Sequence, residues 1–345
     1  MTTSPASAAP ALSVFDAHVD SLQRALDLGH DLGRRGPGQL DLERGRAGGL
    51  GAVVLVCWCE PAYVPPERGG ARARTEALLD CLHALVERHP ERVRFARDGG
   101  ELERANRSGR VAAIAGIEGG HSIEDSLETL EHFFARGVRV MTLVWNVHLC
   151  WIRSCQDGAG PGVPEGLSGF GRAVVRRMNE LGMLVDLSHA GERAFFDALE
   201  AGERPAIASH SACRALHDHP RNLSDDQMRA LAASGGVCGI VFVPGFLGAG
   251  GRADGVVTSE RVLDHVVHAV EVMGVEHVGL GSDFDGTPTP PRGLEDASCY
   301  PVLAEGLAAR GFAQDEVLAV LGGNLRRVFA AATAKRPGPP APVTS

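Results

Sequence analysis

The chain has 345 residues, of which 44% are hydrophobic and 22% charged, and its formal net charge is -9. This composition is typical of a globular protein, long enough for one large α/β barrel or for two modest domains. The negative charge and the absence of an obvious basic patch argue against a nucleic-acid or membrane partner, so we expect a small molecule as the partner.

The ends of the chain and its cysteines carry little chemistry. Residues 1–11 lack the basic start and apolar core of a signal peptide, and no apolar run reaches membrane-spanning length, so we expect a cytoplasmic protein. Eight cysteines in a chain of this size do not suggest a disulfide framework. The pairs Cys57 with Cys59 and Cys150 with Cys155 leave a metal site or an oxidised pair open, but without a matching second pair ordinary thiols are the better explanation.

Extended apolar runs alternate with helical patterns along the chain. We expect strands at 13–20, 51–58, 111–117, 138–145, 183–189, 205–210, 236–243 and 277–283. After a short helix that follows the first strand, we expect helices at 72–89, 122–136, 169–181, 192–201, 224–233 and 259–273 and closing helices within 301–332. Eight strand-helix units with apolar strands predict a parallel sheet covered by helices, and eight units close a (β/α)8 barrel of the TIM type.

An open doubly wound sheet is the alternative architecture. No Gly-x-Gly-x-x-Gly fingerprint follows an early strand, and the residues that could bind metal are spread over five units, which a closed barrel would gather around one axis. We therefore predict one barrel domain over residues 12–334. Residues 1–11 are predicted to be a flexible N-terminus, and the Pro- and Gly-rich residues 335–345 a disordered tail.

Five of the predicted strands end in side chains that can bind metal. In the first strand, His18 and Asp20 lie two residues apart and therefore on one side of an extended chain. The other four strand ends are those of Glu118, His189, His210 and Asp283.

These residue types point to a hydrolytic metal centre at the C-terminal face of the barrel. Two divalent ions could be held if Glu118 bridged them, and mixed imidazole and carboxylate ligands suit zinc, with manganese or cobalt as substitutes. Paired ions about 3.5–4 Å apart share a water and turn it into a hydroxide that attacks a carbonyl. Asp283 would act as the general base beside that water.

Each residue also has a purely structural interpretation. His189 or His210 alone is more readily a hydrogen-bonded barrel histidine, Glu118 a helix cap, and Asp283 or Asp285 a turn cap. Five strand ends that face one mouth make a shared metal centre the better explanation.

At these motifs the chain resembles the membrane (renal) dipeptidase family of zinc metallopeptidases. The resemblance runs over nearly the whole chain, from Phe15 in the first strand to Phe329. Its most specific pieces are Ile117-Glu118-Gly119-Gly120-His121-Ser122-Ile123, Val185-Asp186-Leu187-Ser188-His189, Ser209-His210-Ser211 with Arg221-Asn222, and Gly281-Ser282-Asp283-Phe284-Asp285-Gly286.

The resemblance implies a role for each matching residue. It implies a zinc-dependent dipeptidase, similar to bacterial cytoplasmic members, that cleaves dipeptides with a free C-terminal carboxylate and often accepts a D-residue or glycine there. Asp283 would contact the bridging water and Arg221 would bind the carboxylate, although an ion pair of Arg221 with Asp225 or Asp226 stays open. The implied zinc ligands are His18 and Asp20 for one ion, His189 and His210 for the other, and Glu118 for both.

The fourth strand departs from the family pattern. Typical members have a histidine there that polarises the scissile carbonyl, and this chain has Trp145 instead. We expect Trp145 to form a wall of the substrate pocket, with Asn146 or His148 as a secondary donor; the sequence does not rank the two.

Three functions are therefore compared. The leading hypothesis is a dipeptidase with two zinc ions, and the second is a pathway-dedicated dipeptidase that trims a Cys-Gly or dipeptide-like conjugate. The third is a catalytically silent barrel that acts as a binding protein. It is disfavoured because a ligand-type residue stands at every implied metal-binding position. A homodimer is left open.

Overall fold

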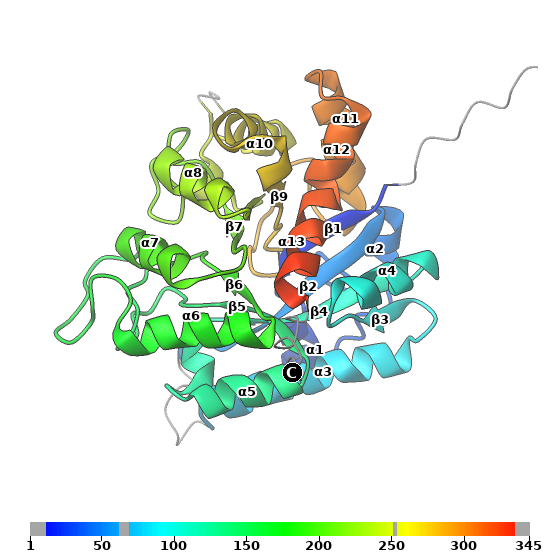
Figure 1. The fold of residues 1–345 in the computed structure, drawn as a ribbon. Coiled ribbons are helices and arrows are strands. Elements are labelled where there is room, and N and C mark those ends of the chain that lie inside the picture. Colours follow the sequence, from blue (N-terminus) through cyan, green and yellow to red (C-terminus); the bar gives the residue numbers. More distant parts are fainter. Residues whose placement is uncertain (1–11, 62–68, 251–253, 335–345) are drawn as a thin grey trace, which may run out of the picture.

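Eight parallel strands close into a barrel in the computed structural model, which describes residues 12–61, 69–250 and 254–334 (Figure 1). Each barrel strand pairs with the next along the chain, β2 pairs with β4, and β1 closes the circle with β9. The strands are β1 (Val14–Val19), β2 (Leu50–Trp58), β4 (Val111–Glu118), β5 (Val138–Thr142), β6 (Leu184–Asp186), β7 (Ile207–Ser211), β8 (Val237–Ile240) and β9 (Val278–Leu280). The predicted TIM-type fold is confirmed. The predicted end segments, 1–11 and 335–345, lie outside the described residues.

Helices cover the outside of the barrel, as Figure 1 shows. The longer helices are α3 (Ala71–Arg88), α4 (Gly99–Arg107), α5 (Leu127–Ala135), α6 (Gly169–Leu181), α7 (Glu192–Ala201), α8 (Asp225–Ala233), α10 (Ser259–Met273), α11 (Tyr300–Ala309) and α13 (Asn324–Thr333). The shorter ones are α1 (Leu22–Leu28), α2 (Leu42–Ala47), α9 (Pro244–Leu247) and α12 (Gln314–Leu318).

Serine caps explain several helix starts. Ser126, Ser168 and Ser224 each accept a backbone N–H of the helix that follows, which satisfies a donor that has no partner within the helix. The helix predicted from residue 122 therefore begins at Leu127, and Gly120–Ile123 form a separate 3₁₀ turn.

One strand and its helix were not predicted. Strand β3 (Val93–Phe95) pairs in parallel with the first residues of β4, through Val93 and Val111, and α4 follows it. Three residues are too few to show a hydrophobic period, so the sequence pattern contains no signal for β3. It is an addition to the side of β4 and does not enter the closed circle of eight strands.

The core has two layers because successive residues of a strand face opposite sides of the sheet. In β2, Val53 and Leu55 pack with helix residues outside the barrel, whereas Val54 and Val56 pack with the residues inside it. Helix α13 contacts β1, β6, β8 and β9 and places Phe329 edge-on to Phe15 of β1, with ring centroids 6.3 Å apart. The C-terminal helix thereby covers the end of the barrel opposite the strand C-termini.

The contact between β7 and the segment after β9 leaves no room for a side chain at Gly281. A Cβ atom there would lie 1.8 Å from the Ser209 carbonyl oxygen, which is backbone and cannot rotate away. We expect Gly281→Ala to lower the free energy of unfolding by about 1–3 kcal/mol, because the strands must separate to admit the methyl group. Chemical denaturation measures the change.

The matched control is Gly169→Ala on the exposed first turn of α6, where a Cβ would meet nothing within 4 Å. Alanine favours a helix over glycine, so this control should be neutral or slightly stabilising. Equal stability of both variants would contradict the tight contact.

Candidate metal centre and active site

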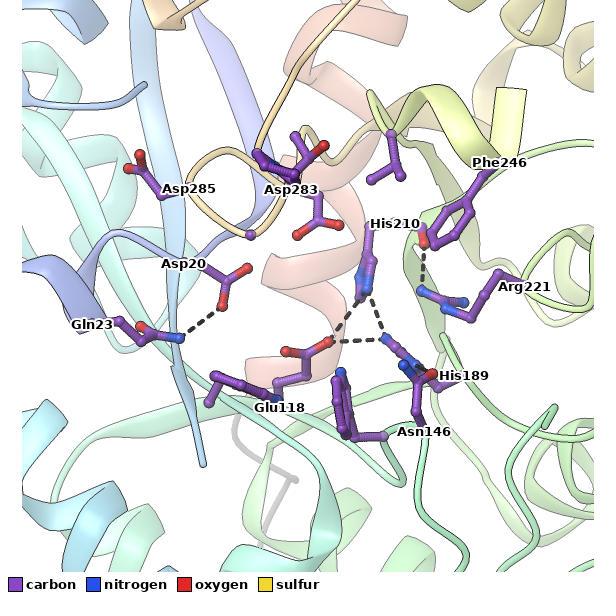
Figure 2. Close-up of a pocket in the computed structure, with 16 residues that line it drawn as sticks. Asp20, Gln23, Glu118, Asn146, His189, His210, Arg221, Phe246, Asp283 and Asp285 are labelled. Atoms are coloured by element: carbon purple, nitrogen blue, oxygen red, sulfur yellow. Dashed lines mark hydrogen bonds and ion pairs between the residues drawn. The ribbon is translucent and has the colours of Figure 1, made fainter. Parts of the chain in front are cut away.

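The predicted strand-end residues meet at the C-terminal mouth of the barrel. A cavity of about 430 Å³ opens there, and Figure 2 shows Asp20, Glu118, His189, His210 and Asp283 pointing toward one another around it. His18 is not among the residues that line the cavity and is 1% exposed. The closed barrel therefore gathers residues that are up to 265 positions apart in the chain, from His18 to Asp283.

Two groups of ligand-type atoms share Glu118. One consists of His18, Asp20 and Glu118 and the other of Glu118, His189 and His210, and in each group the atoms lie within 4.8 Å of one another. Glu118 Oε1 is 2.9 Å from His189 Nε2, 3.4 Å from His210 Nε2 and 3.7 Å from His18 Nε2. Glu118 is therefore common to both groups of possible ligands, and the number of ions that they hold stays a prediction.

Hydrogen bonds on the far side of each imidazole orient the ring nitrogens. His189 Nδ1 lies 2.8 Å from Asn146 Oδ1, and His210 Nδ1 lies 2.8 Å from Ser209 Oγ. With Nδ1 donating in both rings, the two Nε2 atoms carry lone pairs, and they face each other at 3.0 Å. His18 Nε2 is buried and has no hydrogen-bond partner among the described residues. Three imidazole Nε2 atoms, two of them with lone pairs fixed by these hydrogen bonds, thus surround one carboxylate, which is the donor set of a cation site.

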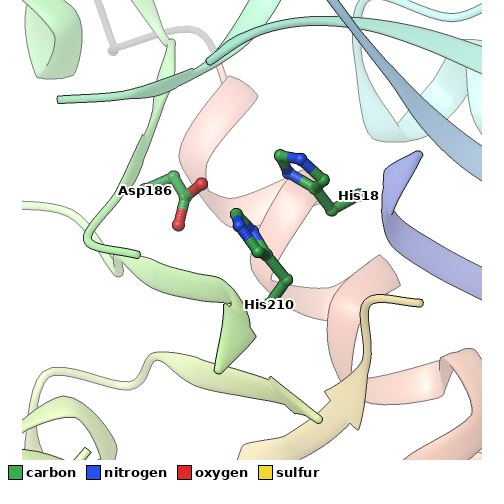
Figure 3. Close-up of side chains that lie close together, drawn as sticks. All are labelled: His18, Asp186 and His210. Carbon is green, nitrogen blue, oxygen red and sulfur yellow. The ribbon is translucent and has the colours of Figure 1, made fainter. Parts of the chain in front are cut away.

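Asp186 joins His18 and His210 in a third group of possible ligands (Figure 3). Its carboxylate is already saturated. Oδ1 accepts the Ser188 and Ser209 backbone N–H groups, at 3.0 and 2.8 Å, and Oδ2 accepts the Thr142 and Ser209 hydroxyls. Because its lone pairs are occupied, Asp186 is a positioning residue: it holds the Ser209 hydroxyl, whose oxygen meets His210 Nδ1. The sequence analysis did not single it out, although it lies two residues after the start of β6.

Burial of several carboxylates around one cavity shifts their protonation. Burial, with repulsion from Asp20, raises the pKa of Glu118 to about 8, and the same two causes raise the pKa of Asp283. Burial opposes the charged form of His18, but attraction from Glu118 and Asp20 outweighs it and raises the pKa of His18 to about 10. Negative charge in this cluster is under-compensated, and divalent cations would supply the missing positive charge. The residues fit the metal that the resemblance implies.

Asp283 sits at a sharp turn against Asp20. Its φ is 62°, in the left-handed region that side chains disfavour, and its backbone N–H donates to the His18 carbonyl at 3.0 Å. A Cβ on Gly286 would lie 2.2 Å from Asp283 Oδ1 and 2.4 Å from Asp20 Oδ2, so only glycine lets the two carboxylates approach. Asp283 thus faces the cluster, as a general base requires; its role stays a prediction.

Asp285 has a different function from that of a simple turn cap. Its side chain accepts hydrogen bonds from Ser21 Oγ and from the Gln39 backbone N–H, the latter at 2.7 Å, and pairs with Arg24 at 2.8 Å. In return, Gln39 accepts the Asp285 backbone N–H. These contacts fasten the loop that carries Asp283 to the start of α1 and to the segment after it.

Arg221 lines the same cavity and is 3% exposed. One NH2 group donates to the His210 carbonyl at 3.1 Å, the guanidinium lies 5.3 Å from the Phe246 ring centroid, and Nε has no partner among the described residues. The alternative ion pair with α8 is not formed, because Asp225 pairs with Arg229 and His268, and Asp226 pairs with Arg229. Burial lowers the pKa of Arg221. A buried cation with free donors is available for an anion.

The residues predicted to bind substrate in the loop after β5 lie in two places, inside the cavity and beside it. Trp145 and Asn146 line the cavity, and Trp145 packs edge-on to Trp58 with ring centroids 5.2 Å apart. His148 is not among the lining residues: its Nδ1 accepts the Ser154 backbone N–H at 3.2 Å, beside the loop.

All eight cysteines are free thiols. No group of possible metal ligands among the described residues includes Cys57 or Cys59, and burial raises the pKa of the Cys59 thiol to about 11. The alternatives of a cysteine metal site or an oxidised pair therefore have no support in the structure.

A closed barrel with a polar cluster of this composition defines a metal-dependent hydrolase, and comparison with known proteins specifies the family. The model of the membrane dipeptidase family, peptidase family M19, matches residues 8–338. Dipeptidase verJ of Clonostachys rogersoniana is 36% identical over 328 residues, which cover 91% of this chain and 79% of that one. Dipeptidase 3 of Rattus norvegicus is 36% identical over 298 residues, covering 85% and 58%.

Among solved structures, a metallopeptidase from Rhodobacter sphaeroides, liganded with a phosphinate mimic of the dipeptide L-Ala-D-Ala, superposes with a TM-score of 0.83 at 27% identity and covers 93% of this chain and 99% of that one. The chain belongs to the membrane dipeptidase family, and it is a metallopeptidase, a hydrolase that acts on peptide bonds. Within the described ranges, no helix has the length and apolar character to cross a bilayer.

Asp186 supports a prediction about metal affinity. Asp186→Asn replaces an acceptor by an NH2 group that cannot accept the Ser209 hydroxyl, so the support of His210 is lost, and we expect metal affinity to fall about 10–100-fold. Competition with a coloured chelator measures the affinity without any assay of activity.

Asp197→Asn is the matched control. Asp197 is also a buried carboxylate with several donors, among them the Leu167 backbone N–H and Arg172, but it lies on α7 away from the cavity. The control should lose stability and keep wild-type metal affinity. Equal affinity of both variants and the wild type would show that Asp186 does not act on the ligands.

Proposed function

We propose that the chain is a zinc dipeptidase that cleaves dipeptides with a free C-terminal carboxylate. The observation that carries the proposal is a buried, under-bonded Arg221 in the same 430 Å³ cavity as two ligand groups that share Glu118. A cavity of that size suits a small substrate, and the charge of Arg221 suits an anion at one end of it.

The donor sets support two ions per chain, with His18, Asp20 and Glu118 around one and Glu118, His189 and His210 around the other. Their mixed nitrogen and oxygen atoms suit zinc. The chemistry that such ions supply is a lowered pKa for water and polarisation of a carbonyl group.

The protein's own groups bind the substrate and move protons. Arg221 holds the carboxylate with parallel charge-assisted hydrogen bonds, which fixes the position of the scissile bond in the cavity. Asp283 takes the proton of the attacking water and passes it to the leaving amine; it lines the cavity beside Asp20, and burial raises its pKa, which favours its protonated form between the two transfers.

A narrower, pathway-dedicated dipeptidase is the second candidate. Trp58 and Trp145 form an aromatic wall, which favours substrates with a side chain that packs on indole rings. A screen of dipeptides, including D-configured C-terminal residues and Cys-Gly conjugates, decides between broad and narrow activity. The cytoplasmic location and a homodimer stay predictions.

The metal stoichiometry is testable through Glu118. The wild type should bind two divalent ions per chain, and Glu118→Gln should retain no more than one, because the neutral amide cannot compensate two cations. Elemental analysis after preparation without chelator, together with the shift of the melting temperature on adding zinc, measures this.

Glu271→Gln, at an exposed position on α10, is the control and should keep two ions. Only trace metal in the wild type after zinc is supplied would contradict the dinuclear site.

The role of Arg221 predicts a dependence on the substrate's anion. Arg221→Met should raise KM for free dipeptides by about 100-fold or more, because a buried charge pair is worth about 2–5 kcal/mol. Dipeptide amides, which lack the anion, should be poor substrates for the wild type and should not be affected further by the substitution. Steady-state kinetics on matched acid and amide pairs provide the test.

Arg229→Met on α8 controls for loss of an arginine and should leave KM unchanged, since Arg229 is exposed and its ion pairs, among the residues that the structure describes, are with Asp225 and Asp226. If the wild type turns over acids and amides equally well, Arg221 does not recognise the carboxylate.

A further inference from the structure

Attack on a peptide carbonyl places negative charge on its oxygen, and a donor fixed in advance must meet that charge. This requirement rests on the proposed function. Trp145 lines the cavity beside the ligand cluster, but an indole N–H is neutral and bulky. The donor must therefore be sought elsewhere around the cavity.

The side-chain amide of Asn146 is held in one orientation by two hydrogen bonds. Its Oδ1 accepts His189 Nδ1–H at 2.8 Å and Gln156 Nε2–H at 3.2 Å. Both donors require an oxygen, so the opposite arm of the amide is the NH2 group. That Nδ2 has no partner in the described part of the chain, and Asn146 lines the cavity.

Asn146 lies where the scissile carbonyl of a bound dipeptide is expected. Figure 2 shows it beside His189, between Glu118 and Arg221. In a dipeptide the scissile carbonyl and the terminal carboxylate are separated by one residue, a span of about 3.8 Å. With the carboxylate on Arg221, the carbonyl would lie between Arg221 and the metal ligands, where Asn146 is.

Two neighbouring donors are weaker candidates. His148 uses Nδ1 as an acceptor for Ser154 and does not line the cavity. The Trp145 indole N–H is free to donate, since it has no partner among the described residues. For the same reason no hydrogen bond orients it, and aligning it would cost free energy during the reaction. The Asn146 amide is already oriented, which is the condition for strong stabilisation of a developing charge.

We propose that Asn146 is a catalytic residue whose Nδ2–H donates to the carbonyl oxygen as it becomes negative, while its Oδ1 keeps His189 in the tautomer that leaves Nε2 free. One amide thereby couples the orientation of a metal ligand to the stabilisation of the substrate's oxyanion.

Two substitutions separate these tasks. Asn146→Asp keeps an acceptor for His189 and removes the donor, whereas Asn146→Leu removes both and adds no charge. Both should lower kcat/KM by about 10²–10³-fold and weaken binding of a phosphinate dipeptide mimic, which carries the oxyanion's charge, by a similar factor. Binding of the product amino acids should change much less. Only Asn146→Leu should weaken metal affinity, by about 10–100-fold.

Asn179→Asp is the matched control. Asn179 lies on α6, and its Oδ1 likewise accepts two N–H groups, those of Glu203 and Arg204, outside the cavity. It should leave kcat/KM and phosphinate binding unchanged.

Wild-type phosphinate affinity in Asn146→Asp would overturn the proposal, as would a loss of phosphinate binding in Trp145→Phe that exceeds the loss in Asn146→Asp. Failure of the wild type to hydrolyse any dipeptide or to bind the phosphinate would instead overturn the proposed function, so the two failures are distinguishable.

Discussion

Repulsion among buried carboxylates is the constraint on which the site depends. Asp20, Glu118 and Asp283 share one mouth of the barrel, and burial with mutual repulsion raises the pKa of Glu118 to about 8. Protonated His18 compensates only part of this charge, since attraction to the same carboxylates raises its pKa to about 10. The arrangement is unfavourable by itself and becomes favourable when cations enter it.

The buried aspartates fall into two kinds, and hydrogen bonding distinguishes them. Asp186 accepts four hydrogen bonds, and Asp16 accepts the backbone N–H groups of His18 and Ser282 and the Tyr300 hydroxyl. These saturated carboxylates hold the strand ends in place. Asp20, by contrast, accepts a hydrogen bond from Gln23, and its other oxygen lies 3.5 Å from His18 Nε2. The lone pairs that the protein leaves unused are those that point into the cavity, where an ion or a substrate can use them.

Much of this organisation could be predicted from the sequence, because apolar strands and the residues that end them are local features. The eight units and the gathering of His18, Glu118 and His210 follow from strand periodicity and barrel closure. What could not be predicted depends on side-chain partners in three dimensions. Asp186 reads as one residue of a buried strand until its four donors are visible, and Asp285 reads as a turn residue although it fastens a loop some 246 positions away, at Gln39.

Ranking Asn146 against His148 shows the same limit. Both residues lie in one loop and both can donate, so composition and spacing treat them alike. The choice depends on how each side chain turns: Gln156 and His189 hold the Asn146 oxygen, and Ser154 engages the His148 ring outside the cavity. Such contacts form only after the loop has packed, and a single sequence carries no signal for them.

The distribution of charge across the cavity links the recognition of the substrate to the position of the bond that is cleaved. Arg221, a buried cation, lies on one side, and the carboxylates of Asp20 and Asp283 lie on the other. A dipeptide is a zwitterion whose ammonium and carboxylate groups are about as far apart as two residues allow, so it aligns with this polarity in one direction only. With the carboxylate on Arg221, as proposed, the single peptide bond would lie over Glu118, whereas a longer peptide bound in the same way would place uncharged backbone, in place of its ammonium group, beside Asp20 and Asp283. Under the proposed function, selection for length would follow from electrostatics, and the wall of Trp58 and Trp145 would select the side chain.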